Sequence, residues 1–269
     1  MAPAAGNADP TGILYGFHPI REALKAGTRP FQRILVLRTD RQFGELVQVA
    51  KAKRIPVHVE PLAALDRLVP NGKHQGVVAI VAAKSYSSAE EILGRARLRQ
   101  EPALVVILDG VEDPHNLGAV LRTAEAAGVH GVFIPERRAA GLTSAVAKVS
   151  AGALDHILVA RVTNLTRLLN ELKDEGLWIY ALDPSTRRPY TDVDMTGPLA
   201  LVAGGENEGI RPGLLKECDA SMRIPLIGKV KSLNVSAAVA VTLFETVRQR
   251  TVKALATGRA SESESCHPE

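Results

Sequence analysis

An alternation of short apolar runs with helical segments, between residues 104 and 255, constrains the fold of this chain more than any other feature. The runs expected to form strands are 104–109, 131–135, 177–182, 199–204 and 222–226. The segments expected to form helices are 116–127, 143–149, 164–175, 212–217 and 234–255. This alternation is typical of a mostly parallel sheet with helices on both faces. We therefore expect an α/β domain over residues 103–256.

A smaller α/β unit is expected ahead of it, over residues 12–82. Its helices are expected at 19–26, 43–53 and 62–68, and its strands at 33–38, 56–60 and 76–82. Residues 83–102 are rich in charge and lack a consistent periodicity, so we interpret them as a linker in which Ser88 can cap one helical turn. The terminal segments 1–11 and 257–269 are expected to be disordered tails.

The small unit carries the basic charge of the chain. Residues 12–82 contain eleven Lys or Arg against five Asp or Glu, a net charge of +6, whereas the whole chain carries +4. A basic module attached to a near-neutral one is expected to meet a polyanion such as a nucleic acid. Taken alone, the charge fits a solvated basic surface equally well.

The composition limits the setting in which the protein works. Hydrophobic residues make up 46% of the chain, and no apolar run has the length needed to cross a bilayer. The first twelve residues lack the basic and apolar regions of a secretion signal. The two cysteines cannot form a disulfide framework, and the seven histidines show no metal-ligand spacing. We therefore expect a cytoplasmic protein that uses no metal and no membrane.

Three segments share the order strand, polar loop, helix. They are PHNLGAVLRTAEAAG (114–128), LVAGGENEGI (201–210) and IPLIGKVKSLNVSAA (224–238). In an open parallel sheet, ligands bind at the carboxyl ends of the strands, where loops and helix N-termini gather. We therefore expect the three segments to form one ligand site.

In the first segment Asn116 is expected to cap the helix, and Arg122 lies off the apolar stripe that faces the sheet. Arg122 is free to reach a ligand, or to pair with Glu125 on the surface. The second segment lacks the dinucleotide and P-loop fingerprints. Its Glu206 suits a ribose, an amine or a cation, although a glycine-rich turn explains the loop too. In the third segment Ser232 and Asn234 are helix caps or site residues.

Together, in this order, the three segments resemble the signature motifs of the SpoU/TrmH family of RNA ribose 2′-O-methyltransferases. The resemblance extends over about residues 12–250, including YGFHPIREAL and HQGVVA in the basic module. Within the family the chain is similar to bacterial enzymes that methylate a guanosine of 23S rRNA. The family's α/β-knot fold implies a trefoil-knotted catalytic domain, which periodicity alone does not reveal.

The resemblance implies the cofactor S-adenosylmethionine and a methyl transfer to a ribose 2′-hydroxyl. The catalytic positions that it implies are Arg122, Asn116, Glu206, Ser232 and Asn234. The positions implied to hold the cofactor, mainly through backbone groups, are Gly204, Ile224 and Leu233. An arginine is a poor base, so we favour a role for Arg122 that involves the adjoining phosphate.

The resemblance also implies partners. The basic module is similar to the RNA-binding domain of kink-turn-binding ribosomal proteins. The resemblance to enzymes that methylate 23S rRNA implies ribosomal RNA, most simply 23S rRNA, as the substrate. His74 and Gln75 lie in its most recognisable loop, where they contact RNA or shape the turn. Family members are homodimers, so residues 234–247 are expected to face a partner copy or the chain's own core.

Two functions of other classes compete with the methyltransferase. One is a non-catalytic RNA-binding factor for ribosome assembly, and the other is a nucleotide-dependent oxidoreductase on a doubly wound sheet. The missing dinucleotide fingerprint disfavours the oxidoreductase. A methyltransferase that acts on another rRNA or on a tRNA stays open beside the 23S substrate.

Overall fold

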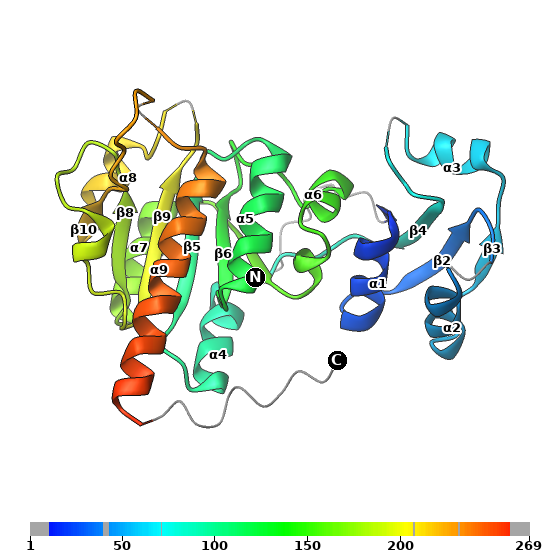
Figure 1. The fold of residues 1–269 in the computed structure, drawn as a ribbon, viewed down its shortest axis with the longest axis horizontal. Helices are drawn as coiled ribbons and strands as arrows, with labels where there is room; N and C mark the ends of the chain where they lie inside the picture. Colours follow the sequence, from blue (N-terminus) through cyan, green and yellow to red (C-terminus); the bar gives the residue numbers. More distant parts are fainter. Residues whose placement is uncertain (1–10, 40–42, 71, 207, 231, 259–269) are drawn as a thin grey trace. The chain divides into compact units, whose positions relative to one another are not determined.

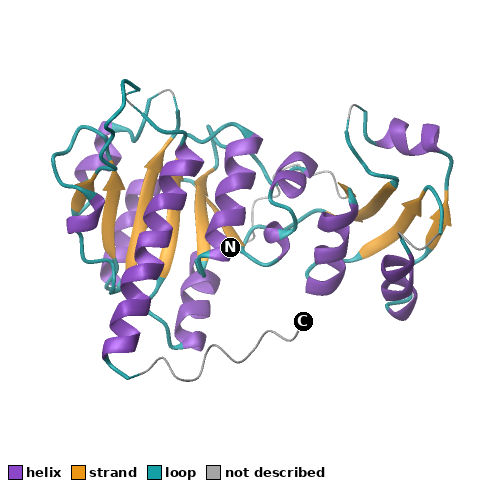
Figure 2. Ribbon diagram, viewed as in Figure 1, coloured by secondary structure: helices purple, strands orange, loops and turns teal. Residues whose placement is uncertain are grey.

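The computed structural model describes residues 11–39, 43–70, 72–206, 208–230 and 232–258 (Figures 1 and 2). The chain forms two compact units. The N-terminal unit comprises the chain up to Tyr86 together with Ala140–His156, and the C-terminal unit comprises Ser87–Ala139 and the chain from Ile157. The tails expected to be disordered fall mainly on 1–10 and 259–269, which lie outside the described residues.

The N-terminal unit is built on a mixed four-stranded sheet. Its strands are β1 (Thr11–Tyr15), β2 (Phe31–Val36), β3 (Val57–Val59) and β4 (Val77–Ala82). The spatial order is β1-β4-β2-β3, with β4 antiparallel to both neighbours and β2 parallel to β3. The short β3 is therefore an edge strand, whereas β4 is central and almost wholly buried.

Helices pack on this sheet through apolar stripes. They are α1 (Phe17–Ala26), α2 (Gly44–Ala52), α3 (Leu62–Leu68) and, from later in the chain, α6 (Ser144–Val149) and the 3-10 turn Ala153–Asp155. A buried ion pair attaches this later segment, because the Arg29 Nε–H donates to Asp155 Oδ1 at 2.7 Å and Nη2 lies 2.6 Å from the same oxygen. Since both side chains are buried, loss of either would leave an unpaired charge in the interior.

The C-terminal unit is built on a parallel six-stranded sheet. Its strands are β5 (Leu104–Asp109), β6 (Gly131–Pro135), β7 (Leu158–Val162), β8 (Trp178–Leu182), β9 (Leu199–Gly204) and β10 (Ala220–Met222). The order is β10-β8-β9-β5-β6-β7, so β5 and β9 are the central strands. Every residue of β5 is buried, as expected for a strand covered on both faces.

Helices cover both faces of this sheet. Side chains of α4 (Ala89–Arg99), α7 (Leu165–Asp174) and α8 (Pro212–Lys216) share one apolar core with alternate residues of the strands. On the other face α5 (Pro114–Ala126) packs beside the long α9 (Val235–Ala256), and Figure 1 shows the two side by side. The arrangement confirms the expected α/β class, and it brings the starts of α5 and α9 to the same sheet edge.

Three differences from the expectations have physical reasons. The linker predicted over 83–102 contains α4, an eleven-residue helix that Ser88 and Glu91 begin with a capping box and that buries Ile92. Strands β1 and β7 were not expected; each lies at the edge of its sheet. Finally, α6 was expected in the large domain but belongs to the N-terminal unit.

Candidate functional site

The helix α5 presents its first turn at the carboxyl end of β5. It begins two residues earlier than expected, because Asp113 is the cap, with its carboxylate accepting from His115 N at 2.9 Å, and Pro114 occupies the first helical position. The prediction that Asn116 caps the helix is therefore wrong. Asn116 instead lies inside the first turn. Its side chain is buried and does not cap the helix.

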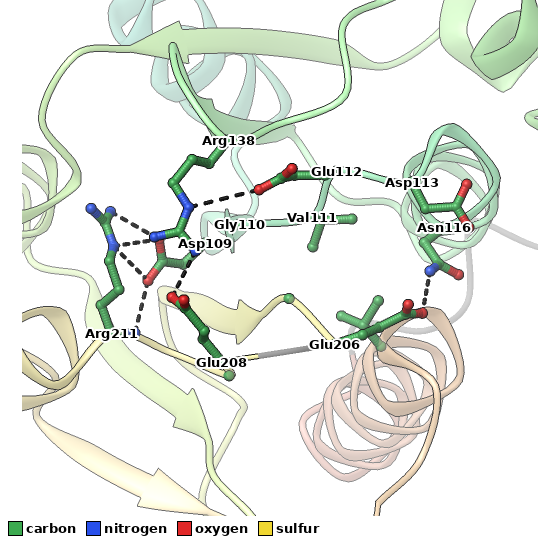
Figure 3. Close-up of a pocket in the computed structure, with 13 residues that line it drawn as sticks. Asp109, Gly110, Val111, Glu112, Asp113, Asn116, Arg138, Glu206, Glu208 and Arg211 are labelled. Carbon is green, nitrogen blue, oxygen red and sulfur yellow. Dashed lines mark hydrogen bonds and ion pairs between the residues drawn. The ribbon is translucent and has the colours of Figure 1, made fainter.

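Three polar side chains, one from each motif, form a closed set of hydrogen bonds. The Asn116 amide donates to Glu206 Oε1, as Figure 3 shows. The Asn234 amide donates to Asn116 Oδ1 at 2.9 Å and to Glu206 Oε1 at 3.0 Å. We call Asn116, Glu206 and Asn234 the polar ring. The structure thus brings together three of the five side chains expected to be catalytic.

The orientation of Asn234 is set by its place in α9. It is the N-cap, and its Oδ1 accepts from the backbone N–H of Ser236 at 2.9 Å and from the Ser236 hydroxyl at 2.6 Å. Since the oxygen is held by the helix, the amide nitrogen must face Glu206 and Asn116. The sequence left open whether Asn234 is a helix cap or a site residue. In the structure it caps α9 and also belongs to the polar ring.

The glycines of the second motif allow the backbone to close around the strand ends. A Cβ on Gly204 would lie 2.0 Å from the Gly209 carbonyl carbon, and a Cβ on Gly205 would lie 2.0 Å from the Gly110 oxygen. The Gly205 N–H donates to the Asp109 carbonyl at 2.7 Å. Only glycine fits these two close approaches, and the tight loop that results places Glu206 beside α5 and α9.

A pocket of about 500 Å³ opens between the loops that follow β8, β9 and β10. We call it the motif pocket. It is lined by Leu182, Asp183, Pro184, Ala203, Gly204, Gly205, Glu206, Gly209, Met222, Arg223, Ile224, Leu226, Ser232, Leu233, Asn234, Val235 and Ala238. Gly204, Ile224, Leu233 and Ser232, all expected at the site, are among these residues, and two members of the polar ring form part of its wall.

The lining of the motif pocket suits a ligand with apolar and hydrogen-bonding parts. Side chains such as Leu182, Met222 and Val235 supply apolar surface. No backbone hydrogen bond from another described residue engages the amides of Ile224 or Leu233. These amides are therefore available to a ligand, which is the condition for recognition by the backbone.

A second, smaller pocket of about 260 Å³ is lined by Asn116 and Glu206 among others (Figure 3), and it shares Glu206 with the motif pocket. We call it the acidic pocket. Its rim carries Asp109, Glu112, Asp113, Glu206 and Glu208, with Arg138 and Arg211 between them. The excess of carboxylates disfavours a bare phosphate and suits a hydrogen-bond donor.

Two arginines organise the acidic pocket. Arg211 holds the buried Asp109, with Nε 2.8 Å and Nη2 2.8 Å from Oδ1. Arg138 donates to Glu208 Oε2 at 2.6 Å and approaches Glu112 at 3.7 Å. Hydrogen bonding to Arg138 lowers the pKa of Glu208. The sequence analysis assigned no function to these side chains, although Arg138 follows the carboxyl end of β6 and Asp109 ends β5.

Arg122 is separate from both pockets. Its side chain is exposed on α5 and lines neither the motif pocket nor the acidic pocket. No hydrogen bond or ion pair joins it to another described residue, so the surface pair with Glu125 does not form. Its guanidinium is available to an anion that comes from outside the chain.

The loop of His74 and Gln75 is held by internal bonds of the N-terminal unit. His74 is buried, donating from Nε2 to Asp66 at 2.9 Å and accepting at Nδ1 from Gly76 N at 3.1 Å. The Gln75 amide oxygen accepts from Phe17 N at 3.2 Å. Both residues therefore shape the turn in this structure. In the part of the chain that the structure describes, no group of three or more potential metal ligands occurs, and no helix could span a membrane.

Family models match both units. The model described as SpoU rRNA Methylase family matches residues 103–244. The model described as RNA 2′-O ribose methyltransferase substrate binding matches residues 13–87. The Bacillus subtilis protein YacO, assigned to the TrmH family tRNA/rRNA methyltransferases, is 42% identical over 236 residues, which cover 87% of this chain and 94% of that protein.

Solved structures share the fold of almost the whole chain. The SpoU methyltransferase AviRb from Streptomyces viridochromogenes, solved in complex with the cofactor AdoMet, is 26% identical with a TM-score of 0.75, covering 90% of this chain and 91% of that one. The AdoMet-bound rRNA methyltransferase from Sinorhizobium meliloti is 25% identical with a TM-score of 0.72, covering 89% and 87%. With the polar ring built from the family's three motifs, the chain belongs to the SpoU rRNA methylase family of RNA methyltransferases.

Proposed function

We propose that this protein transfers a methyl group from S-adenosylmethionine to a ribose 2′-hydroxyl of ribosomal RNA, with a guanosine of 23S rRNA as the target. The observation that carries the proposal is the polar ring on the wall of the motif pocket, where one carboxylate and two amides from three distant segments converge. Such a convergence positions reacting groups, and positioning is a large part of the rate of a methyl transfer.

The motif pocket fits the proposed cofactor. Its volume of about 500 Å³ lies in the range of small-molecule sites. The free amides of Ile224 and Leu233 suit the polar edges of an adenosine, and apolar side chains suit its flat faces. The absence of a side chain at Gly204 and Gly205 keeps the backbone accessible at the pocket wall. When bound, S-adenosylmethionine supplies an electrophilic sulfonium methyl group.

The residues around the pocket have distinct proposed roles. Glu206, held by both asparagines, accepts a hydrogen bond from the ribose or from the cofactor. Ser232, exposed at the mouth of the motif pocket, is free to rotate its hydroxyl toward the same groups. Arg122 binds the phosphate beside the target ribose, which stabilises the negative charge that develops on the oxygen as it loses its proton.

The acidic pocket is the proposed site of the target base. It adjoins the polar ring at Asn116 and Glu206, so a ribose at the ring would direct its base toward Glu112 and Glu208. Their carboxylates accept hydrogen bonds, and the N1–H and amino group of guanine are donors. This complementarity supports guanosine as the target over bases that lack two adjacent donors.

We also propose that two copies associate through α9 and that the C-terminal chain is knotted, as the α/β-knot fold implies. Four apolar side chains on α9, Val241, Phe244, Val252 and Leu255, are exposed by 38–64%. Their spacing of three, eight and three residues places them along one side of the helix. Covering this stripe with a second copy would remove apolar surface from water.

The test is a methyl-transfer assay with labelled S-adenosylmethionine and unmodified 23S rRNA, 16S rRNA or tRNA. Products are mapped by resistance to alkaline cleavage, which needs a free 2′-hydroxyl. We expect one alkali-resistant guanosine in 23S rRNA. A single alkali-resistant site in 16S rRNA or tRNA would support the proposed reaction and contradict the proposed substrate. Label in an alkali-sensitive product, or tight RNA binding without label, would contradict the proposed reaction, and the second result would favour an assembly factor.

A further inference from the structure

A second surface with the features of a binding site lies within the N-terminal unit, on the sheet face that α3 covers only in part. Arg33 and Leu35 are two residues apart on β2, so their side chains lie on the same face of the sheet. Leu35 pairs with His58 on β3, which puts His58 and Glu60 on that face too. Across from them, α3 contributes residues spaced three and four apart. A groove of about 420 Å³ lies between, lined by Arg33, Leu35, His58, Glu60, Ala64, Arg67 and Leu68.

Three of the four polar side chains of this groove pair with no described residue. Arg33 and His58 are exposed and Glu60 is half-buried, and no hydrogen bond or ion pair joins any of their side chains to another described residue. Arg67 uses its Nε–H on the Ala63 carbonyl at 3.1 Å and keeps its two terminal nitrogens for other acceptors. These groups are hydrated in the free protein, and each can exchange water for a ligand group without breaking a hydrogen bond to a described residue.

The floor of the groove is apolar. Leu35 is buried at its base, and Leu68 and Ala64 are half-buried on the α3 side. A flat group that covers Leu35 would lie in the same groove as His58 and the apolar residues of α3. An apolar floor, a ring for stacking, two guanidinium groups and one carboxylate together match a nucleotide, whose base can stack and can donate to Glu60 while its phosphates meet the guanidinium groups. The carboxylates of an acidic peptide can neither stack on the ring nor donate to Glu60.

We propose that this groove binds one unpaired nucleobase of the RNA substrate. Arg33 and Arg67 bind the flanking phosphates, His58 stacks on the base, and Glu60 accepts a hydrogen bond from a base N–H. The inference rests on the proposed RNA substrate, and it adds a contact within the N-terminal unit that is independent of the chemistry at the polar ring. The net charge of +6 on residues 12–82 provides long-range attraction, whereas the groove provides a specific contact.

The first test measures RNA affinity without turnover. Binding of in vitro transcribed 23S rRNA is compared for the wild type, the double variant Arg33→Gln/Arg67→Gln, and a control, Arg54→Gln, an exposed arginine of the same unit that does not line the groove. We expect the double variant to weaken binding tenfold or more and to lower the slope of log K against log salt by about two. Equal affinities for the double variant and the control would overturn the proposal.

The second test asks whether a base occupies the groove. RNA that carries 4-thiouridine is cross-linked to the wild type, and the modified peptides are identified by mass spectrometry. We expect cross-links within 33–38 and 57–68, lost in His58→Ala and restored in His58→Phe, which keeps a ring. If the cross-links fall only elsewhere in the N-terminal unit, the proposal that the groove binds a base is overturned. Failure of the wild type to bind 23S rRNA or tRNA at all would instead overturn the proposed function on which the groove depends.

Discussion

The polar ring and the groove of the N-terminal unit differ in how their polar side chains are held. In the ring, Asn116, Glu206 and Asn234 bond to one another before any ligand arrives. In the groove, the side chains of Arg33 and His58 form no hydrogen bond or ion pair with a described residue. A reaction needs groups whose positions are already set, because their reorganisation would raise the barrier. Binding a flexible polyanion needs donors that are still free.

Arg122 is the most informative exception to this contrast. It is exposed and pairs with no described residue, like the groove residues, but it lies in the first of the three motifs and we propose that it takes part in the chemistry. We expect Arg122→Ala to lower the methyl-transfer rate about 10²- to 10³-fold through loss of charge stabilisation at the oxygen. Thermal stability should not change, since the Arg122 side chain forms no hydrogen bond or ion pair with a described residue. A matched control is Arg167→Ala, an exposed arginine on α7 paired with Glu171, which should leave the rate unchanged. An unchanged rate in Arg122→Ala would remove this residue from the chemistry.

Gly205→Ala tests the close packing of the loop that carries Glu206 of the polar ring. The added Cβ would lie 2.0 Å from the Gly110 oxygen, so the loop that carries Glu206 must shift. We expect a loss of about 1–3 kcal/mol in the free energy of unfolding and a further loss of activity. The control is Gly197→Ala, where a Cβ meets no atom within 4 Å and the expected change is within about 0.5 kcal/mol. Equal stability of the two variants in urea unfolding would mean that the loop is not close-packed.

Asn234→Ala, compared with the loss of a plain helix cap, separates the two roles of Asn234 as the cap of α9 and as a member of the polar ring. We expect a loss of about 1 kcal/mol of stability from the missing cap, together with weaker cofactor binding or slower turnover from the missing bonds to Asn116 and Glu206. Asn164→Ala removes a comparable cap from α7, where the side chain accepts from Arg167 N at 3.1 Å and from no other described residue. Urea unfolding and activity are measured on both variants. Equal activity of the two variants would mean that Asn234 only caps the helix and has no role in the reaction.

The smallest expected effect concerns His130, which is buried between β5 and β6. Its Nδ1 accepts from Leu104 N at 3.1 Å, and burial lowers its pKa, against the opposing influence of Glu101. A lowered pKa in the folded state means that the unfolded chain binds the proton more readily. Stability that is present above about pH 6.5, the ordinary value, is therefore lost as the pH falls below it. Urea unfolding from pH 8 to 5 should show this loss in the wild type and not in His130→Gln.

Much of the fold follows from periodicity. The buried runs that became β5, β6 and β9 and the long α9 are placed by apolar patterning to within about a residue. Strand β7 was missed because Arg161 interrupts its apolar run at the sheet edge. Helix α4 was missed because its short apolar stripe is embedded in charge, and only its packing on the sheet makes the stripe evident. Local patterns do not record such tertiary contacts.

The site was partly predictable for a different reason. The strand-end rule placed the three motifs at one edge, and the polar ring forms there. Nothing in the sequence indicates that the Asn234 amide reaches Asn116, 118 residues away, or that Arg138 joins Glu208 across 70 residues. Those contacts depend on strand order, which the sequence alone leaves open. The attachment of 140–156 to the N-terminal unit through Asp155 depends on tertiary packing in the same way.

The central claim is that the polar ring serves the chemistry and not merely the fold or the cofactor's affinity. The direct measurement is single-turnover methyl transfer by Glu206→Gln at saturating RNA and S-adenosylmethionine, with the cofactor Kd determined by calorimetry on the same preparation. The variant keeps the size of the side chain and removes its charge. We predict a rate at least about 10²-fold lower with a Kd within about threefold of the wild type. An unchanged rate, or a loss explained entirely by weaker cofactor binding, would contradict the claim.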